Sequence, residues 1–146
     1  MAIKSHMKEK FAASMLRFVT AVKKESEICY ELSGSFNEKE LFIIVFIGQN
    51  QNVKMSDIAE NLRVPVSTLT TIVDKLVDRK FLIRVHSDED RRVVNVALTN
   101  KGKNSHKVFL KRKDVMAQKL LSTFNEAEQE KFIQYLNKMS AAIESL

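Results

Sequence analysis

Apolar residues recur at helical spacing in the first and last parts of the chain. Between Lys8 and Leu32, and again near the C-terminus, successive apolar positions are three, four or seven residues apart. The two stripes consist of Phe11, Met15, Phe18, Val22 and Cys29, and of Phe132, Leu136, Met139, Ile143 and Leu146. Residues with this spacing share one face of an α-helix. The pattern therefore predicts a long amphipathic helix at each end of the chain.

The segment after the first helix predicts a second, shorter helix. Gly34 stands where the left-handed residue that ends many helices is expected. Asn37 and Glu40 have the spacing of a capping box, in which each side chain accepts the backbone N–H of the other residue. The run LFIIVFI at 41–47 would also suit a strand, but the capping pattern favours a helix that stops at Gly48.

Two short helices joined by a tight turn are predicted next. In MSDIAENLRV (55–64) the apolar residues Ile58, Ala59 and Leu62 have helical spacing. Pro65 interrupts this helix because the residue before a proline is displaced from the α region. VSTLTTIVDKLVDRK (66–80) then resumes the helical period, which completes a helix-turn-helix pattern.

Two strands complete a winged helix-turn-helix. FLIRVHS (81–87) and VVNVAL (93–98) flank the turn DEDRR, and Val94, Val96 and Leu98 share one face by the two-residue period of a strand. Thr99 is placed to cap the helix that follows, which is basic as far as Lys113 and amphipathic to Phe124. A second capping-box pattern, formed by Asn125 and Glu128, predicts the start of the last helix.

The predicted fold class is mainly α (α+β), a winged helix-turn-helix with flanking N- and C-terminal helices. The compact winged part offers no obvious partner for the apolar faces of the flanking helices, so we expect them to pair in a homodimer. The expected domains are 7–36 (N-terminal dimerisation helix), 37–102 (winged helix-turn-helix) and 103–146 (C-terminal dimerisation helices). Residues 1–6 are left out because Ser5-His6-Met7 resembles a remnant of an expression vector.

Composition narrows the class of protein. The 146 residues are 45% hydrophobic and 29% charged, with three Gly and one Pro, which is typical of a globular, helix-rich chain. The single cysteine, Cys29, excludes an internal disulfide, and no apolar run approaches the roughly 20 residues that span a bilayer. We therefore expect a cytoplasmic protein without membrane contact. The net charge of +6, concentrated at 99–113, is compatible with a nucleic-acid partner.

The second helix of a helix-turn-helix lies in the major groove with its N-terminal residues facing the bases. The candidate DNA-binding residues on this helix and at its start are Pro65, Ser67, Thr68, Thr70, Thr71 and Lys75. Hydroxyl groups can bond phosphates or bases, and threonine methyls can touch thymine methyls. Without DNA, the same cluster would only begin a solvent-exposed helix. Asp74 and Asp78 would repel phosphates and are expected to point sideways, pairing with Lys75 or Arg79.

The turn DEDRR would project from the tip of a hairpin. Arg92 in such a position can enter the narrow minor groove, where the negative potential is focused. Asp90 lies two residues earlier and would hold Arg92 in one rotamer if the extended geometry persists. The alternative is an ordinary surface ion pair, which contributes about 0–1 kcal/mol.

The stretch DRRVVNVALTNKG resembles the D-R-R-x-x-x-V-x-L-T-x-x-G signature of the MarR family of transcriptional regulators. The matching positions are Asp90, Arg91, Arg92, Val96, Leu98, Thr99 and Gly102, and Arg84 matches the usual arginine of the preceding strand. The resemblance implies a homodimer with interlocked terminal helices that binds a pseudo-palindromic operator and represses transcription. It also implies that Arg92 enters the minor groove with Asp90 as its anchor, that Arg91 lies beside a phosphate, and that a small-molecule effector or an oxidant releases the DNA.

The chain departs from the family pattern at three positions. Lys80 stands where glycine usually follows the recognition helix. Ser87 and Glu89 replace a more usual Asp and Arg, which leaves the tip of the wing less basic.

Enzymatic and metal-binding functions find no support in the residue pattern. His6, His86 and His106 are scattered and none neighbours Cys29, so the histidines and the one cysteine of this chain are not expected to form a tetrahedral zinc site without carboxylates. Cys29 lies on an apolar stripe, where a buried structural thiol is expected rather than an oxidant sensor. We expect no cofactor, and the predicted function is a DNA-binding transcriptional regulator. The alternative is a winged-helix protein–protein interaction module that does not bind DNA.

Overall fold

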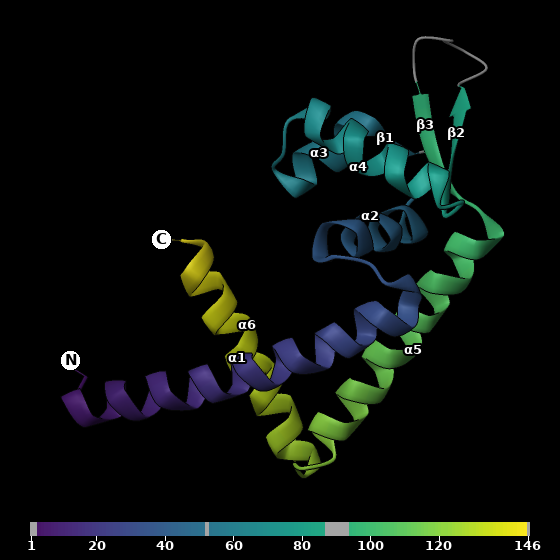
Figure 1. Cartoon of the computed structure of the whole chain (residues 1–146). Helices are drawn as coiled ribbons and strands as arrows, with labels where there is room; N and C mark the ends of the chain where they lie inside the picture. Colours follow the sequence, from purple (N-terminus) through teal and green to yellow (C-terminus); the bar gives the residue numbers. More distant parts are fainter. Residues whose placement is uncertain (1–2, 52, 87–93, 146) are drawn as a thin grey trace. The chain divides into compact units, whose positions relative to one another are not determined.

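The computed structural model describes residues 3–51, 53–86 and 94–145. The chain folds as two compact units, Met1–Phe109 and Leu110–Leu146. The first unit holds the helices α1 to α4, the three strands and the start of α5 (Figure 1).

Helix α1 (Ser5–Gly34) is the long N-terminal helix that the sequence predicts. Its left-handed end residue is Ser35, with φ of 54°, so the prediction of Gly34 for this role was wrong. The helix continues through Gly34, and the backbone N–H of Phe36 donates to the carbonyl of Tyr30 at 3.2 Å, which closes the last turn one residue later than expected.

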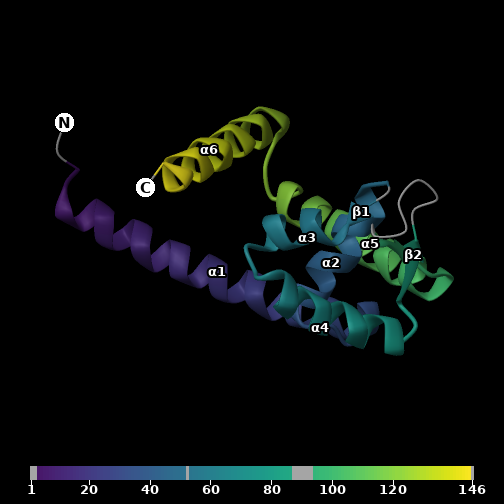
Figure 2. The same cartoon turned by 90° about the horizontal axis from the view of Figure 1, so that it is seen from above.

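The apolar stripe of α1 is only partly covered within the first unit. Phe11 and Phe18 are 57% and 42% exposed, whereas Met15, Val22 and Cys29 are half-buried. Leu16, which lies outside the stripe, is 69% exposed. The N-terminal turns of α1 run clear of helices α2 to α4 (Figure 2). No helix in the described ranges combines the length and apolar character needed to cross a membrane.

Helix α2 (Glu38–Gln49) confirms the choice of helix over strand for LFIIVFI. Its predicted capping box is present: the Glu40 N–H donates to Asn37 Oδ1 at 2.9 Å and the Asn37 N–H donates to Glu40 Oε2 at 3.0 Å. Ile43 and Ile44 are fully buried. The buried face of α2 therefore packs in the core against the next two helices, α3 and α4.

The helix-turn-helix consists of α3 (Met55–Leu62) and α4 (Val66–Asp78). Arg63 ends α3 in the left-handed conformation with φ of 53°, and Pro65 occupies the N-cap position of α4. The break predicted from Pro65 is therefore confirmed.

Three strands form one antiparallel sheet in the order β1–β3–β2. The strands β2 (Leu82–His86) and β3 (Val94–Leu98) pair with Leu82 opposite Leu98 and His86 opposite Val94, which gives the predicted hairpin, called here the wing. The two-residue strand β1 (Val53–Lys54) adds to the free edge of β3 and was not predicted, because two residues are too short to show a period.

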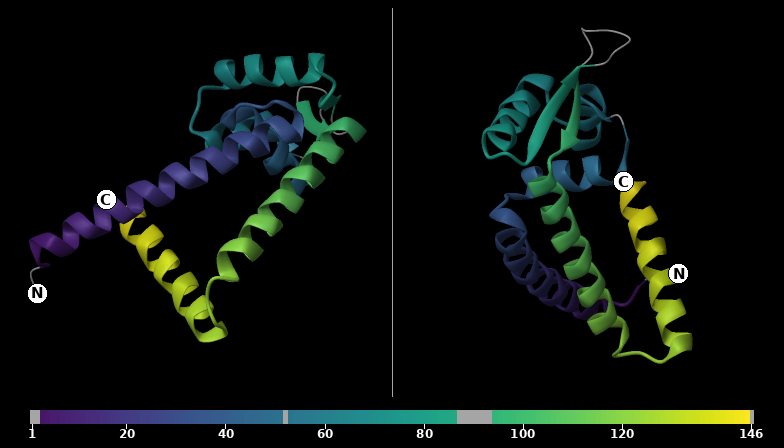
Figure 3. Two further views of the ribbon diagram at one scale, coloured as in Figure 1. Left: turned by 60° about the horizontal axis from the view of Figure 1, so that its bottom comes forward. Right: turned by 90° about the vertical axis from the view of Figure 1, so that its right-hand side faces the viewer.

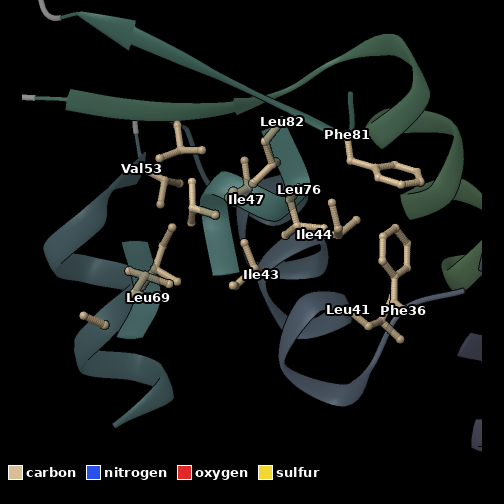
Figure 4. Packing of buried hydrophobic residues seen from close by; sticks show 14 residues of the cluster. Phe36, Leu41, Ile43, Ile44, Ile47, Val53, Leu69, Leu76, Phe81 and Leu82 are labelled. Carbon is tan, nitrogen blue, oxygen red and sulfur yellow. The ribbon is translucent and has the colours of Figure 1, made fainter. Parts of the chain in front are cut away.

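One hydrophobic core lies between the helix-turn-helix, α2 and the sheet (Figure 4). Its fully buried residues include Ile43, Ile44, Ile58, Leu69, Val73 and Leu76. At one end, the rings of Phe36 and Phe81 meet edge to face with their centroids 4.7 Å apart. The core therefore ties the start of α2 to the end of α4.

The start of α5 (Asn100–Leu121) is fixed by the predicted cap, Thr99. Its hydroxyl accepts the Gly102 N–H at 3.1 Å and donates to the carbonyl of Lys80 at 2.6 Å. Gly102 is needed here because a Cβ would lie 2.2 Å from the carbonyl oxygen of Phe81.

A second close approach joins α5 to α2. A Cβ on Gly48 would lie 2.4 Å from Nδ1 of His106, so the imidazole ring packs directly on the α2 backbone. The Nε2 atom of His106 is buried and has no hydrogen-bond partner.

The second unit contains the end of α5 and α6 (Glu126–Glu144), joined by a short turn (Figure 3). The predicted capping box of Asn125 and Glu128 is present, with bonds of 3.0 and 3.1 Å. The rings of Phe124 and Phe132 stack with centroids 5.0 Å apart. No residue of α6 is buried, and Ile143 is 67% exposed, so its apolar face is open as well.

Candidate nucleic-acid interface

The recognition helix α4 is anchored by its inner face. Leu69, Val73 and Leu76 have no exposed surface, and they follow one another at steps of four and three residues. Fully buried aliphatic side chains at this spacing hold a helix in one rotation about its axis. The rotation determines which residues α4 presents on the opposite side.

That opposite side carries an exposed row, called here the α4 ridge, formed by Ser67, Thr68, Thr71 and Lys75. Residues three and four apart on a helix are neighbours. Val66, the first residue of α4, is 53% exposed beside this row and was missed by the sequence reasoning. The ridge therefore offers hydroxyls, methyl groups and one positive charge along the N-terminal and central turns.

Two of the three threonine hydroxyls of α4 donate hydrogen bonds to carbonyls of their own helix. Thr71 Oγ1 donates to the carbonyl of Ser67 at 3.3 Å, and Thr70 Oγ1 donates to the carbonyl of Val66 at 2.8 Å. Toward a ligand these two residues can therefore offer oxygen lone pairs and methyl groups. Thr70 is half-buried and lies at the edge of the ridge.

The start of α4 is suited to an anion. Pro65 has φ of −59° and makes no side-chain cap, so the N–H groups of the first turn are not bonded by a capping side chain. Such groups, together with the positive end of the helix dipole, favour phosphate oxygens.

The sequence predicted that Asp74 would pair with Lys75 or Arg79, but this prediction was wrong. Oδ1 of Asp74 lies 2.5 Å from Nη2 of Arg84, on strand β2. The two side chains are 49% and 35% exposed, so the pair is open to solvent and its energetic contribution is modest. The pair links the recognition helix α4 to strand β2 of the wing. The positive charge of Arg84 compensates the negative charge of Asp74 next to the ridge.

Arg79 pairs with Glu40 instead, at 3.2 Å, and sequence reasoning could not find this contact because 39 residues separate the two. The following residue, Lys80, has φ of 64°, the left-handed conformation. The family pattern places glycine here, and the structure shows why: the turn from α4 into β2 requires a positive φ, which only glycine adopts without strain.

The predicted wing-tip residues Asp90, Arg91 and Arg92 lie outside the described residues. The described part of the wing brings Arg84 and Asp74 together, but it does not address the predicted pairing of Asp90 with Arg92.

An open cavity of about 400 Å³ lies on α1, away from the α4 ridge. It is lined by Phe18, Val19, Val22, Lys23, Ser26, Glu27 and Tyr30 of α1 and by Glu38 of α2. Burial raises the pKa of the Tyr30 phenol above its usual value, with a further contribution from the negative charge of Glu38. The wall is mostly apolar, with charged groups among its lining residues.

The sequence and the fold of this chain are similar to those of known helix-turn-helix regulators. The MarR family profile matches residues 36–94. The HTH-type transcriptional repressor MdtR of Bacillus subtilis (strain 168) is 31% identical over 107 residues, covering 73% of this chain and 68% of MdtR. The regulator YfiV of the same organism is 27% identical over 106 residues, covering 73% of this chain and 66% of YfiV.

Solved structures extend the similarity to nearly the whole chain. The YusO protein of Bacillus subtilis superposes with a TM-score of 0.80 at 23% identity, covering 97% of this chain and 99% of YusO. FabT of Streptococcus pneumoniae, crystallised in complex with DNA, gives 0.78 at 25% identity, covering 97% and 99%. The relatives found by sequence are transcriptional regulators rather than enzymes. Fold, helix-turn-helix and sequence similarity together place the chain in the MarR family of transcriptional regulators.

Proposed function

We propose that the chain binds double-stranded DNA as a homodimer and represses transcription from a pseudo-palindromic operator. The observation that carries the proposal is the α4 ridge, an exposed polar row on a helix whose other face is locked in the core. FabT, which shares the fold at 25% identity, has been crystallised with DNA, and MdtR is named a repressor. The regulator would act in the cytoplasm, where the genome is accessible.

In this proposal α4 lies in the major groove. Ser67 and Thr68 in its first turn face bases or phosphates, Thr70 and Thr71 contribute lone pairs and methyl groups, and Lys75 reaches a phosphate. Pro65 brings the open first turn close to the DNA backbone.

The wing contributes the second set of contacts. Arg92 enters the minor groove with Asp90 as its anchor, and Arg91 lies beside a phosphate, as the family signature implies. Arg84 sits at the described base of the wing, where its pair with Asp74 orients the wing against the recognition helix. Substitution of Arg92 by Ala should weaken operator binding and leave the free energy of unfolding nearly unchanged. An equal loss of both would make Arg92 a structural residue.

Dimerisation involves residues 7–36 and 103–146, which flank the winged domain 37–102. The exposed apolar faces of α1 and α6 support this assignment, because large exposed apolar surfaces on soluble proteins usually bind a partner. Removal of residues 132–146 should abolish the dimer. A truncated chain that still sediments as a dimer would show that α6 does not carry the interface.

A small-molecule effector is proposed for the α1 cavity. Its mostly apolar wall, with Lys23, Glu27 and Glu38 among its lining residues, fits an aromatic or aliphatic molecule with a polar group. MepR of S. aureus, which shares the fold at 22% identity and a TM-score of 0.69, has been crystallised with ethidium bromide. The cavity is therefore the place to look for ligand density or chemical-shift changes.

The decisive experiment is selection of binding sites from random duplexes with the full-length chain. A two-fold symmetric consensus with half-sites about 10–10.5 bp apart is expected for two recognition helices on one face of the DNA. The logarithm of the affinity should fall with the logarithm of salt by about 0.9 per phosphate neutralised.

A matched pair of lysines localises the interface. Lys75→Gln removes a charge from the ridge and should reduce the salt slope by about 0.9. Lys39→Gln removes the same charge from an exposed position on α2 and should leave the slope unchanged. Equal slopes for both variants would exclude the ridge as the phosphate-binding surface.

The second candidate function, a winged-helix module that binds another protein, makes the opposite prediction. Duplex DNA of any sequence would then fail to bind even at low salt, where nonspecific binding is strongest. That result would overturn the proposed function as a whole.

A further inference from the structure

Arg79, the residue that follows α4, reaches away from the DNA-binding ridge toward the end of α1 and the start of α2. Its Nη1 donates to Glu40 Oε2 at 3.2 Å. Its Nη2 donates to the carbonyl of Gly34 at 2.6 Å and to that of Ser35 at 3.2 Å. All three acceptors lie 39 to 45 residues earlier in the chain, so one side chain joins three helices.

The acceptors are rigidly placed. Glu40 is only 4% exposed, and the same Oε2 also accepts the Asn37 N–H in the capping box of α2. Gly34 and Ser35 are the last residue and the left-handed end residue of α1, where carbonyls have no partner within the helix. A guanidinium presents several N–H donors in a fixed plane, which a lysine ammonium cannot reproduce.

Two aromatic rings enclose the guanidinium. Its carbon lies 5.2 Å from the ring centroid of Phe36 and 5.0 Å from that of Phe81. A Cβ on Gly34 would lie 3.0 Å from both rings, so glycine allows them to close over the site. The partial enclosure lowers solvent screening and strengthens the bonds to the carboxylate and carbonyls.

The backbone of Arg79 adds a fourth element. Its carbonyl accepts a hydrogen bond from Nζ of Lys101, on α5, at 2.9 Å. This ammonium group lies 4.2 Å from the ring centroid of Phe81. The C-terminal end of the recognition helix is thus a node where α1, α2, α4 and α5 meet. Most of α1 before Ser33 is exposed or half-buried, so this node is a principal attachment of α1 to the winged core.

We infer that Arg79 is a positioning residue that holds the recognition helix at a fixed angle to α1, so that DNA binding by α4 and the state of α1 depend on each other. The inference rests on the proposed function, since it assigns a role in specific DNA binding. Arg79 does not touch DNA; it acts through α4. Tyr30 and Glu38, which line the α1 cavity, lie four and two residues from Gly34 and Glu40, so the cavity borders the same node.

The test compares the affinity of full-length variants for the selected consensus duplex with their affinity for a scrambled duplex of the same length. Arg79→Gln should lower the affinity for the consensus at least tenfold and change that for the scrambled duplex less than threefold, at a temperature where circular dichroism shows every variant folded. Arg79→Lys keeps the charge and should recover part of the loss. Lys39→Gln, one residue from Glu40, is the matched control for lost charge and should keep the wild-type ratio.

Glu40→Gln is the milder probe from the other side. Its amide oxygen can still accept the Asn37 N–H, so α2 stays capped, while the charge that faces Arg79 is lost. It should lower the consensus-to-scrambled ratio by an intermediate factor. If Arg79→Gln does not fold, Glu40→Gln and Arg79→Lys carry the test by the same criterion.

The outcomes separate the two proposals. A wild-type chain without a consensus would overturn the proposed function and the positioning role with it. A specific wild-type chain whose Arg79 and Glu40 variants keep the wild-type ratio, even if their unfolding temperatures fall, would overturn the positioning role alone.

Discussion

Replacement of Lys80 by glycine should stabilise the protein. Lys80 is exposed and has φ of 64°, so it holds a left-handed conformation in the turn between α4 and β2. A residue with a Cβ pays about 1–2 kcal/mol in this conformation. Its hydrogen bonds are made by backbone atoms: the N–H donates to Val77 at 2.8 Å and the carbonyl accepts the Thr99 hydroxyl at 2.6 Å. Glycine keeps both bonds.

The expected gain follows from two opposing terms. Relief of the left-handed strain contributes about 1–2 kcal/mol, and the greater freedom of glycine in the unfolded chain removes about 0.5–1 kcal/mol. Lys80→Gly should therefore raise the free energy of unfolding by up to about 1.5 kcal/mol, with the middle of the range at about 0.75 kcal/mol. For a chain of this length the melting temperature should rise by a few degrees, on the order of 2–4 °C per kcal/mol.

The assay is urea unfolding at one fixed protein concentration, because a dimer's apparent stability depends on concentration. An unchanged m-value would show that the gain reflects stability alone. Lys107→Gly is the matched control: this lysine is exposed within α5, where glycine should cost about 1 kcal/mol. If both variants lose stability equally, strain at Lys80 is not the reason for the family's glycine.

Three further predictions concern contacts described above. Gly48→Ala should lower the free energy of unfolding in urea by about 1–3 kcal/mol, because the added methyl overlaps the His106 ring. Adding His106→Ala should restore part of this loss, and no recovery in the double variant would contradict the packing. Burial raises the pKa of Tyr30, so the unfolded chain ionises first and wild-type stability should fall as pH rises above about 10. Tyr30→Phe should show a smaller fall in the urea midpoint over this range, and identical curves would refute the assignment. Asp74→Asn should change stability by less than about 1 kcal/mol but raise affinity for unrelated duplex DNA, because Arg84 is released; unchanged affinity in fluorescence anisotropy would argue against this.

Features that depend on neighbours along the chain could be predicted from the sequence. The capping box of Asn37 and Glu40 joins residues three apart, and the break at Pro65 follows from the covalent geometry of proline. The signature around Leu98 and Thr99 identified the end of the wing and the start of the next helix, and the structure confirms both.

Contacts between distant segments could not be predicted. Arg79 and Glu40 are separated by 39 residues, and nothing in either local pattern indicates the other. Asp74 was expected to pair with a neighbour on its own helix, but Arg84 reaches it because the turn at Lys80 folds β2 back beside α4. Thr70 and Thr71 could be placed near the ridge, yet their hydroxyl bonds depend on side-chain rotamers that the sequence leaves open.

The bonds of Thr99 have a consequence for how regulators of this kind can diversify. Its N–H donates to Phe81 at 3.1 Å and its hydroxyl to Lys80, so the hairpin is closed at its base, where Leu82 faces Leu98. The hydrogen bonds of Thr99 and the pairing of β2 with β3 do not depend on the residues between His86 and Val94. Segments taken from other regulators could be grafted between these two residues, giving chimeras with altered operator preference on an unchanged scaffold.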